Sequence, residues 1–328
     1  MALSEFELIR RYFSHCGAER ADVLLGVGDD AALLDSAPGQ DLVAAIDTLV
    51  EGVHFLPLAA AASIGHRALA VNLSDLAAMG ARPAWALLAI TLPCVDEPWL
   101  AAFAQGFGTL ARAHGVALVG GNTTRGPLSV TVQILGHVPH AQALKRSGAS
   151  AGDAVFSSGT SGDAAAGLAL EAGRLELDDA AAAAQLRSRF SFPTPRNALG
   201  ERLRDLASAC IDVSDGLFAD AAKLAAASGC GIEIAFDELA VSASLVRAVG
   251  MERARHLALT GGEDYELCFA VPPARIEELE RVLPPARWEY RRIGTLRAAP
   301  AALVTRGGNV MEFSHSGFDH FASQERAE

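Results

Sequence analysis

The 328-residue sequence has few basic residues and lacks any long hydrophobic run. Lysine and arginine number 27 against 39 aspartates and glutamates, so the formal net charge is -12. This balance argues against a surface that binds nucleic acid or anionic membranes. No uninterrupted apolar stretch is long enough to span a bilayer. We therefore expect no nucleic-acid partner and no membrane association.

Cysteines are also few and widely scattered along the chain. The sequence has five, namely Cys16, Cys94, Cys210, Cys230 and Cys268. An odd number without a close pair fits buried thiols in a reducing compartment and gives no zinc-binding pattern. The N-terminal stretch carries Glu5 and Glu7 and lacks the apolar core of a signal peptide. The sequence therefore predicts a soluble, cytoplasmic protein.

Several common catalytic motifs are missing as well. The sequence has no G-x-x-x-x-G-K-[ST] phosphate-binding loop and no G-x-G-x-x-G followed by a helix and a distant acidic residue. It has no G-x-S-x-G nucleophile turn and no pair of histidines at zinc-binding spacing. These absences exclude P-loop nucleotide chemistry, dinucleotide binding of the usual type, the serine-hydrolase turn and a zinc-based mechanism.

Paired carboxylates are what the sequence does contain near its N-terminus. An apolar run at residues 23–25 is followed by Gly26 and Gly28, and then by Asp29 and Asp30. Glycines permit a tight turn with close backbone approach. Two adjacent carboxylates are costly to bury unless a cation neutralises them. The stretch is either a solvated turn between a strand and a helix or part of a cation site.

The same arrangement recurs along the chain, which favours a cation site. The apolar run at residues 43–46 ends in Asp47, and the run at 209–211 ends in Asp212. Asp215 follows three residues later, so Asp212 and Asp215 could flank one ion. Two glycines at 120–121, which are expected to end a strand over 116–119, are followed by Asn122. Several expected strand ends thus present an oxygen ligand.

Two further polar residues have an open interpretation. Asp75 lies in a helix expected over residues 63–79, where Asn72 is on the same face and the neighbours are apolar. Its carboxylate is either a satisfied polar group of the core or a metal ligand. His54 follows the strand that ends at Asp47, and an isolated histidine is more often structural than a ligand.

The arrangement of expected elements predicts an α/β protein of two domains. Strands alternate with helices along the chain, and 328 residues suit two domains at about 150 residues each. Residues 139–153 lack periodicity and include the basic pair Lys145 and Arg146, which can also be read as a solvated linker. We place one domain at residues 1–138 and the other at residues 139–328.

The candidate ligands together favour magnesium chemistry. They are hard oxygen donors: Asp29, Asp30, Asp47, Asp75, Asp212, Asp215 and the neutral Asn122. Magnesium prefers such ligands together with water and substrate phosphates. A group of ions can neutralise a triphosphate without a P-loop lysine. The residues alone therefore predict an enzyme that uses a nucleotide and several magnesium ions.

At these motifs the sequence resembles a known family. The motifs in order are Gly26–Ala31, Asp47–Phe55, Asn72–Gly80, Gly120–Pro127, Arg146–Ala149, Ile211–Leu217 and Thr260–Leu267. Together they resemble the thiamine-monophosphate kinase family, in the superfamily that includes aminoimidazole ribonucleotide synthetase and selenophosphate synthetase. The resemblance extends over nearly the whole length.

The resemblance implies an activity and a fold. The expected reaction is ATP-dependent phosphorylation of thiamine phosphate to thiamine diphosphate, with direct attack of the substrate phosphate on the γ-phosphorus. The expected fold has two α/β domains of mixed sheets covered by helices, and a homodimer formed through the N-terminal sheets. ATP and several Mg²⁺ ions are the expected co-substrate and cofactors.

The resemblance also implies roles for individual residues. The magnesium ligands would be Asp30, Asp47, Asp75, Asn122, Asp212 and Asp215. The ATP-binding positions would be Gly121, Asn122, Arg146 and Ser214. The contacts to thiamine phosphate would be His54, Glu263 and the aromatic Phe318, whose ring suits stacking on a cationic heterocycle.

Three residues depart from the family pattern. The family usually has aspartate where this chain has Asn122, and serine or threonine where it has Ala45 and Ile46. We expect all three around one metal position, which would lose a charge and two hydroxyl ligands. Two other functions stay open: a sister enzyme with another substrate, and a catalytically weakened protein that binds nucleotide or thiamine phosphate.

Overall fold

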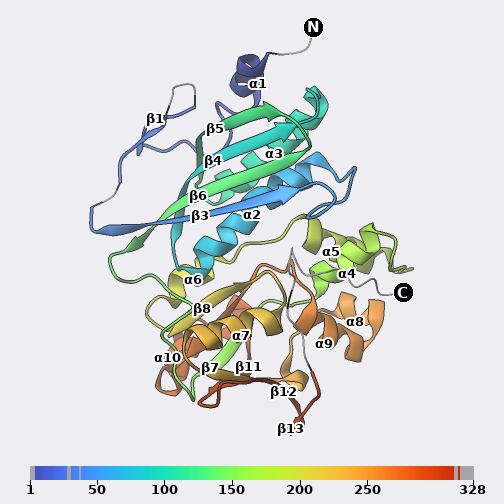
Figure 1. Ribbon diagram of the computed structural model, residues 1–328. Helices are drawn as coiled ribbons and strands as arrows, with labels where there is room; N and C mark the ends of the chain where they lie inside the picture. The colour runs from blue at the N-terminus through green and yellow to red at the C-terminus, as the bar shows by residue number, and fades with distance from the viewer. Residues whose placement is uncertain (1–3, 28–30, 37, 314–316, 318–328) are drawn as a thin grey trace. The chain divides into compact units, whose positions relative to one another are not determined.

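The computed structural model describes residues 4–27, 31–36, 38–313 and 317 (Figure 1). The chain divides into two compact units. Unit 1 comprises Met1–Lys145 and Ser191–Leu206, and unit 2 comprises Arg146–Phe190 and Ala207–Glu328. The sequence predicted one domain boundary, between residues 138 and 139. The first change between the two compact units lies after residue 145, and the later segment 191–206 belongs to unit 1.

Unit 1 is built on a four-stranded mixed sheet in the order β3-β6-β4-β5. β4 and β5 are parallel, and β6 is antiparallel to β3 and β4. The strands are β3 (Gln40–Val50), β4 (Arg82–Leu92), β5 (Ala117–Arg125) and β6 (Ser129–Pro139), with a separate small sheet of β1 (Val23–Leu25) and β2 (Leu33–Leu34). The helices are α1 (Glu5–Tyr12), α2 (Ala61–Ala78), α3 (Glu97–Ala113) and α6 (Asn197–Leu203).

Helices α2 and α3 lie behind the four-stranded sheet in Figure 1 and enclose the core of unit 1 with it. Helix α2 begins at Ala61, two residues before the start that the sequence predicted. α1 has a capping box, because the Ser4 hydroxyl accepts from the Glu7 N–H and the Glu7 carboxylate accepts from the Ser4 N–H. α3 begins after Asp96, whose side chain accepts from the Trp99 N–H. These local contacts explain why the helices start there.

Small residues allow α2 to pack closely on its neighbours. A Cβ added at Gly65 in α2 would lie 2.2 Å from the Phe103 carbonyl oxygen of α3. A Cβ added at Gly200 in α6 would lie 2.0 Å from the Ala77 carbonyl oxygen of α2. The contact at Gly200 explains why segment 191–206 belongs to unit 1.

Strand β5 is longer than the sequence suggested. The predicted strand ended at residue 119, before two glycines, but β5 continues to Arg125. A register shift between Ala86 and Leu87 of β4, which pair with Leu118 and Gly120, accommodates one extra residue in β5. A Cβ at Gly121 would lie 1.8 Å from the Leu88 carbonyl oxygen, so the glycine permits the strands to pair closely. The prediction was wrong here because these glycines continue a strand.

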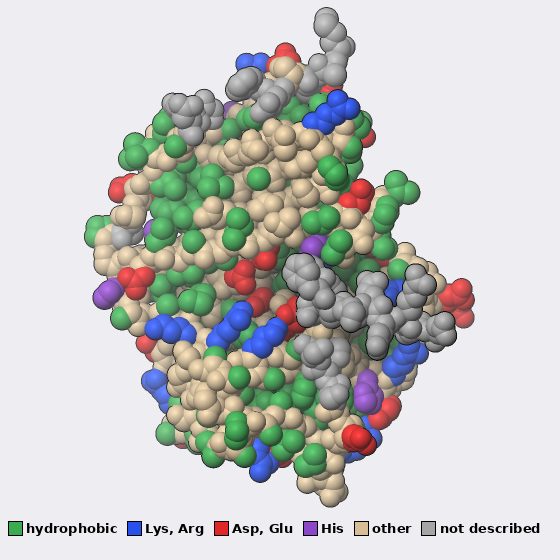
Figure 2. Space-filling view, in the orientation of Figure 1, with side chains coloured by type: hydrophobic (Ala, Val, Ile, Leu, Met, Phe, Trp, Pro, Cys, Tyr) green, Lys and Arg blue, Asp and Glu red, His purple; other side chains and the backbone are tan. Residues whose placement is uncertain are grey.

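The other face of the four-stranded sheet carries exposed hydrophobic side chains. Side chains of β3 alternate between the two faces, and Leu42 and Ile46 are 55% and 62% exposed. Figure 2 shows hydrophobic side chains over this face of unit 1. An apolar sheet face of this kind is unusual unless something covers it.

Unit 2 is built on a seven-stranded sheet in the order β13-β12-β9-β11-β7-β10-β8. Its strands are β7 (Ala154–Ser158), β8 (Ala209–Val213), β9 (Gly231–Ala235), β10 (Glu266–Val271), β11 (Tyr290–Arg297), β12 (Ala302–Arg306) and β13 (Asn309–Val310). Its α-helices are α4 (Asp163–Glu171), α5 (Ala180–Ser191, whose last residue falls in unit 1), α7 (Leu217–Ala227), α8 (Ala243–Val249), α9 (Met251–Thr260), α10 (Ile276–Val282) and α11 (Pro285–Trp288). Short 3-10 helices cover Phe236–Glu238 and Pro273–Arg275.

Buried strands give unit 2 its core. Every residue of β7, β8 and β10 is buried, and apolar side chains of α7 join the same core. This explains why those strands read as continuous apolar runs in the sequence. Figure 1 shows α7 lying across one face of the sheet. In the part of the chain that the structure describes, no helix has the length and apolar character needed to cross a membrane.

The crossing of α2 and α3 gives a test of the fold of unit 1. A Cβ at Gly106 would lie 2.0 Å from the Ala62 carbonyl oxygen, whereas at Gly108 of the same helix the nearest atom is the Arg112 Nη1, 3.1 Å away at the end of a flexible side chain. Both Gly→Ala changes gain about 1 kcal/mol of helix propensity. Overpacking against backbone costs about 1–3 kcal/mol or more. Thermal unfolding should show a lower Tm for Gly106→Ala than for Gly108→Ala, and equal Tm values would contradict the close crossing.

Candidate functional site

Asp47 lies near the C-terminal end of β3, on the face that packs against the helices. Its side chain is half-buried, like those of Val43 and Ala45, which pack on the core. Ile46 projects from the opposite face, as alternation along a strand requires. The three departures from the family pattern therefore do not surround one position, because the Ile46 side chain points away from the side of Asp47.

Gly121 and Asn122 lie side by side in β5. Asn122 is exposed and is paired with Ala89 of β4. Gly121 has a φ of 152° and sits over the Leu88 carbonyl. Glycine is therefore required here by strand pairing, whether or not a nucleotide approaches the backbone.

Asp75 lies near the C-terminal end of α2 and is half-buried. Asn72, one turn earlier, is fully buried, and its Nδ2 donates to the Ala68 carbonyl at 3.0 Å. The helix thus keeps Asn72 in the core and brings Asp75 nearer to solvent. The side chain of Asp75 is therefore more accessible than that of Asn72, as a metal ligand would need to be.

His54 lies in the turn after β3, and its imidazole is oriented by the backbone. The His54 Nδ1 accepts the Val50 N–H at 3.0 Å, and the backbone N–H of His54 donates to the Val50 carbonyl at 2.9 Å. A neutral imidazole that accepts at Nδ1 carries its proton on Nε2. The turn therefore directs the Nε2–H as a donor.

A cavity of about 470 Å³ opens at the C-terminal ends of β4 and β5. Its lining includes Thr123, the residue after Asn122, and most of the lining residues are apolar. The lining residues are Leu8, Leu92, Pro93, Cys94, Val95, Thr123, Thr124 and Arg125. An apolar cavity with a few polar groups at one side is typical of a small-molecule site.

Two of the predicted site residues lie outside the described part of the chain. These are Asp30, with its neighbour Asp29, and Phe318. Gly317, which is described, approaches the predicted ligand Asp215, because a Cβ added at Gly317 would lie 3.3 Å from the Asp215 Cβ.

In unit 2, Ser214 and Asp215 form the turn between β8 and α7. The buried carboxylate of Asp220 shapes this turn, since its Oδ2 accepts the N–H of Ser214 and that of Asp215, each at 2.9 Å. Lys223 donates to the Asp215 Oδ2 at 2.5 Å and to the Asp220 Oδ1 at 2.8 Å. Asp220 thus holds the backbone of the turn, and Lys223 lies between the two carboxylates.

The electrostatics of this turn follow from burial and pairing. Burial raises the pKa of the Asp220 carboxyl, although hydrogen bonds from Lys223 and from the turn oppose the shift. Burial lowers the pKa of Lys223, but hydrogen bonds to Asp215 and Asp220 outweigh it and leave the pKa raised. The ammonium group shows that a cation is accommodated beside the Asp215 carboxylate.

The loop that carries Glu263 is attached to the same turn. The Glu263 N–H donates to the Ser214 carbonyl and the Tyr265 N–H to the Val213 carbonyl, both at 2.8 Å. The pairing of β10 with β8 then sets Leu267 opposite Asp212. Unit 2 therefore brings Glu263 next to the motif that carries Asp212, Ser214 and Asp215.

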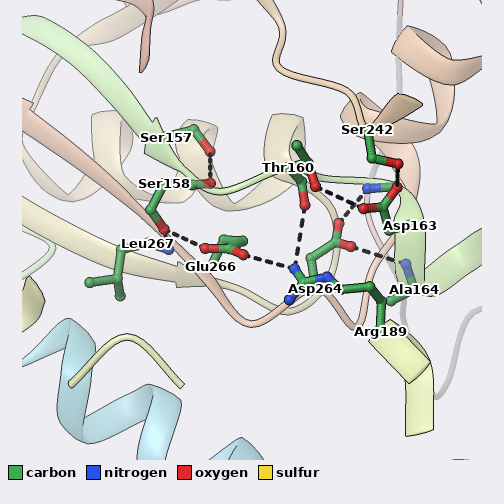
Figure 3. A network of polar contacts seen from close by, with 11 residues as sticks. Ser157, Ser158, Thr160, Asp163, Ala164, Arg189, Ser242, Asp264, Glu266 and Leu267 are labelled. Carbon is green, nitrogen blue, oxygen red and sulfur yellow. Dashed lines mark hydrogen bonds and ion pairs between the residues drawn. The ribbon is translucent and has the colours of Figure 1, made fainter. Parts of the chain in front are cut away.

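A second buried carboxylate, Asp264, attaches this loop to α4. Its Oδ2 accepts the Gly162 N–H at 2.7 Å and its Oδ1 the Ala164 N–H at 3.3 Å (Figure 3). N–H groups at the start of a helix such as α4 have no partner within the helix, and a negative charge near them is favourable. Burial raises the pKa of Asp264 well above its usual range, although these two N–H groups and the charge of Arg189 lower it in part.

Other polar side chains of unit 2 extend these contacts, although the buried Nε of Arg189 has no hydrogen-bond partner. Fully buried Glu266 accepts from Arg189 at 2.8 Å and from the Ser158 hydroxyl at 2.6 Å (Figure 3). Asp163 accepts from the hydroxyls of Thr160 and Ser242 at 2.7 and 2.6 Å. A buried network is stable only when its members have partners, and this one fixes the loop between β7 and α4.

Arg146 is exposed at the start of unit 2. Its carbonyl oxygen accepts from the Ser228 hydroxyl at 3.0 Å, and the Ala149 N–H donates to the same hydroxyl at 3.3 Å. Ser228 therefore positions the backbone around Arg146, and the guanidinium is presented to solvent.

The oxygen ligands fit a hard cation but do not form a complete set within either unit. Asp47, Asp75 and Asn122 belong to unit 1, and Asp212 and Asp215 to unit 2. Among the residues that the structure describes, no three His, Cys, Asp or Glu side chains come together as a metal-binding group. Carboxylate and amide oxygens are nevertheless the donors that magnesium prefers.

Sequence reasoning missed the residues that hold the site in shape. Asp220 and Lys223 were not identified, and Asp264 was noted only as part of a motif. The available indication was the acidic residue in the first turn of α7, where a carboxylate can accept free N–H groups. For Asp264 the partners lie 100 and 102 residues away, which the sequence does not reveal.

Asp220 gives a direct test of how the turn is held. Asp220→Ala removes two backbone hydrogen bonds and one partner of Lys223, which should lower the free energy of unfolding by about 2–5 kcal/mol. Asp237→Ala is the control, because this carboxylate makes an exposed ion pair with Arg255 and should contribute less than about 1 kcal/mol. Hydrogen exchange of the peptide over residues 209–220 should accelerate in the first variant only. Matching Tm and exchange in both variants would contradict this role of Asp220.

Comparisons with known proteins agree over nearly the whole chain. Residues 28–138 match the family AIR synthase related protein, N-terminal domain, and residues 150–305 match AIR synthase related protein, C-terminal domain. Thiamine-monophosphate kinase of Salmonella typhimurium is 48% identical over 324 residues, which cover 98% of this chain and 100% of that protein.

Solved structures give the same result. Thiamine-monophosphate kinase from Stenotrophomonas maltophilia is 44% identical with a TM-score of 0.84, covering 95% of this chain and 99% of that one. A structure of AaThiL complexed with AMPPCP and TMP is 32% identical with a TM-score of 0.77, covering 89% and 91%. These similarities confirm the predicted two-domain α/β fold. The chain therefore belongs to the thiamine-monophosphate kinase family of enzymes, among the AIR synthase related proteins.

Proposed function

We propose that this enzyme transfers the γ-phosphate of ATP directly to thiamine phosphate and forms thiamine diphosphate, assisted by several Mg²⁺ ions. The full-length similarity to thiamine-monophosphate kinases carries the proposal, and one similar structure is a complex with AMPPCP and TMP. The arrangement of Ser214, Asp215 and Glu263 in unit 2 supports it, because candidate nucleotide, metal and substrate residues share one turn and one loop.

We assign the magnesium ligands to both units. Asp30, Asp47, Asp75 and Asn122 would supply oxygens from unit 1, and Asp212 and Asp215 from unit 2. When bound, the ions would neutralise the triphosphate and stabilise the charge that develops during in-line transfer. The Lys223 ammonium beside Asp215 supports a cation at that carboxylate.

The remaining assignments concern the two substrates. Gly121, Asn122, Arg146 and Ser214 would bind ATP, and the apolar cavity after Asn122 is a suitable place for its base. His54, Glu263 and Phe318 would bind thiamine phosphate. The acceptor is an anionic phosphate, so its attack requires little help from a general base.

The substitution at Asn122 limits one metal position. An amide oxygen can coordinate magnesium but brings no charge to a site that depends on electrostatics. Ala45, beside Asp47 on the inner face of β3, supplies no hydroxyl either, but β3 and β5 are opposite edges of the sheet, so the two substitutions affect separate positions. We infer that water completes the coordination wherever an ion binds at these positions.

A coupled assay of ADP release, with and without thiamine phosphate, tests this function. ADP release should depend on both thiamine phosphate and Mg²⁺. Glu263→Gln and His54→Ala should raise the KM for thiamine phosphate roughly ten- to a hundredfold and leave the KM for ATP nearly unchanged, as expected for lost hydrogen bonds to charged groups.

Two matched variants serve as controls for that assay. Glu289→Gln changes another glutamate of unit 2 with a left-handed backbone, and His140→Ala removes an exposed histidine paired with Asp41. Neither should change either KM. An equal loss of affinity for ATP and for thiamine phosphate in Glu263→Gln and His54→Ala would refute the assignment of these residues to thiamine phosphate. ADP release that does not depend on thiamine phosphate would favour a different substrate, and no ADP release would favour a binding role.

We also propose a symmetric homodimer formed through the exposed face of the four-stranded sheet. Hydrophobic residues on β3, among them Leu42 and Ile46, make this face a suitable interface. Light scattering at micromolar concentration should give twice the chain mass. Ile46→Lys should shift the mass toward the monomer, whereas Met251→Lys, which changes an exposed apolar residue of unit 2, should not. A fully active wild-type monomer would refute the dimer.

A further inference from the structure

The loop that carries Glu263 has an unusual backbone. Glu263 and Tyr265 have φ angles of 70° and 52°, a left-handed conformation that residues other than glycine rarely adopt. Such conformations persist only where the surrounding structure determines them, and they occur often at functional sites. The contacts around the loop therefore indicate what this backbone is for.

Contacts on both sides hold this backbone in place. The Asp264 carboxylate, between the two left-handed residues, accepts N–H groups of Gly162 and Ala164. The N–H groups of Glu263 and Tyr265 donate to β8 and its turn at 2.8 Å. The loop also lies so close to the turn that a Cβ at Gly262 would be 2.4 Å from the Ser214 carbonyl oxygen.

This backbone places the side chains of Glu263 and Tyr265 in direct contact. The Tyr265 hydroxyl donates to the Glu263 Oε2 at 2.8 Å. Tyr265 is only 7% exposed, so packing fixes its ring, whereas Glu263 is half-buried. A glutamate side chain has several rotatable bonds, and a fixed donor restricts the orientation of its carboxylate.

We propose that Tyr265 is a positioning residue for the acceptor substrate: its buried hydroxyl holds the Glu263 carboxylate in the orientation that receives a cationic or N–H-bearing heterocycle. The proposal rests on the assignment of Glu263 to the thiamine phosphate side of the site. Tyr265 acts through Glu263. The backbone that Asp264 holds sets the hydroxyl within reach of the carboxylate.

The test is Tyr265→Phe, which removes only the hydroxyl. The KM for thiamine phosphate should rise about two- to tenfold, the range for one hydrogen bond, with the KM for ATP unchanged. Calorimetric titration with thiamine phosphate alone should show the same loss of affinity without turnover. In Tyr265→Phe/Glu263→Ala the loss should equal that of Glu263→Ala, because the alanine leaves the hydroxyl no carboxylate to position.

Tyr290→Phe is the matched control for a merely structural effect. Tyr290 is 6% exposed, lies in the same unit, and donates its hydroxyl to the Leu283 carbonyl at 2.6 Å. This variant should lower the Tm at least as much as Tyr265→Phe and leave the affinity for thiamine phosphate unchanged.

The outcomes separate this inference from the proposed function. If Glu263→Gln weakens thiamine phosphate binding and Tyr265→Phe does not, the positioning role is wrong. Equal losses for ATP and thiamine phosphate in Tyr265→Phe, or a further loss in the double variant, would also overturn it. If Glu263→Gln itself has no effect, the assignment of Glu263 to the substrate fails.

Discussion

Two buried carboxylates that accept backbone N–H groups determine the shape of the site in unit 2. Asp220 holds the turn at Ser214 and Asp215, and Asp264 attaches the Glu263 loop to the start of α4. A carboxylate in such a place is expensive to bury without partners, so each turn is stable only in the conformation that supplies those partners. The two aspartates therefore fix the Glu263 loop against the turn that carries Ser214 and Asp215.

Unit 1 achieves comparable rigidity by a different means. Its candidate residues lie on regular elements: Asp47 on β3, Asp75 on α2 and Asn122 on β5. Close packing at glycines holds those elements together, as where Gly121 lies over a carbonyl of β4. Side chains on rigid strands and helices are placed more accurately than those on loops. The short loops of unit 2 need the buried aspartates for the same purpose.

The sequence predicted much of the order of elements, because that order depends on local patterns, whereas the roles of the candidate residues stay predictions. The helix around Asp75 and the apolar strand that contains Asp212 follow from short-range rules. The predicted break before Gly120 was wrong, since only strand pairing distinguishes a glycine in a strand from one in a turn. The prediction that Ile46 lies at the metal position beside Asp47 was wrong, because side chains alternate along β3 and Ile46 points to the opposite face. Asp30 and Phe318 lie outside the described residues, and the partners of Asp264 are too distant in sequence to be inferred.

The most direct test of this account is a crystal structure of the enzyme with a non-hydrolysable ATP analogue, thiamine phosphate and Mg²⁺, compared with one of the ligand-free enzyme. We expect Ser214, Asp215 and Glu263 to contact the ligands or their ions. The bonds of Asp220 and Asp264 to backbone N–H groups should be present in both structures, with the two loops superposing within about 1 Å, as in other pre-organised sites. Ligands bound away from these residues, or loops rebuilt with those bonds broken, would contradict the account.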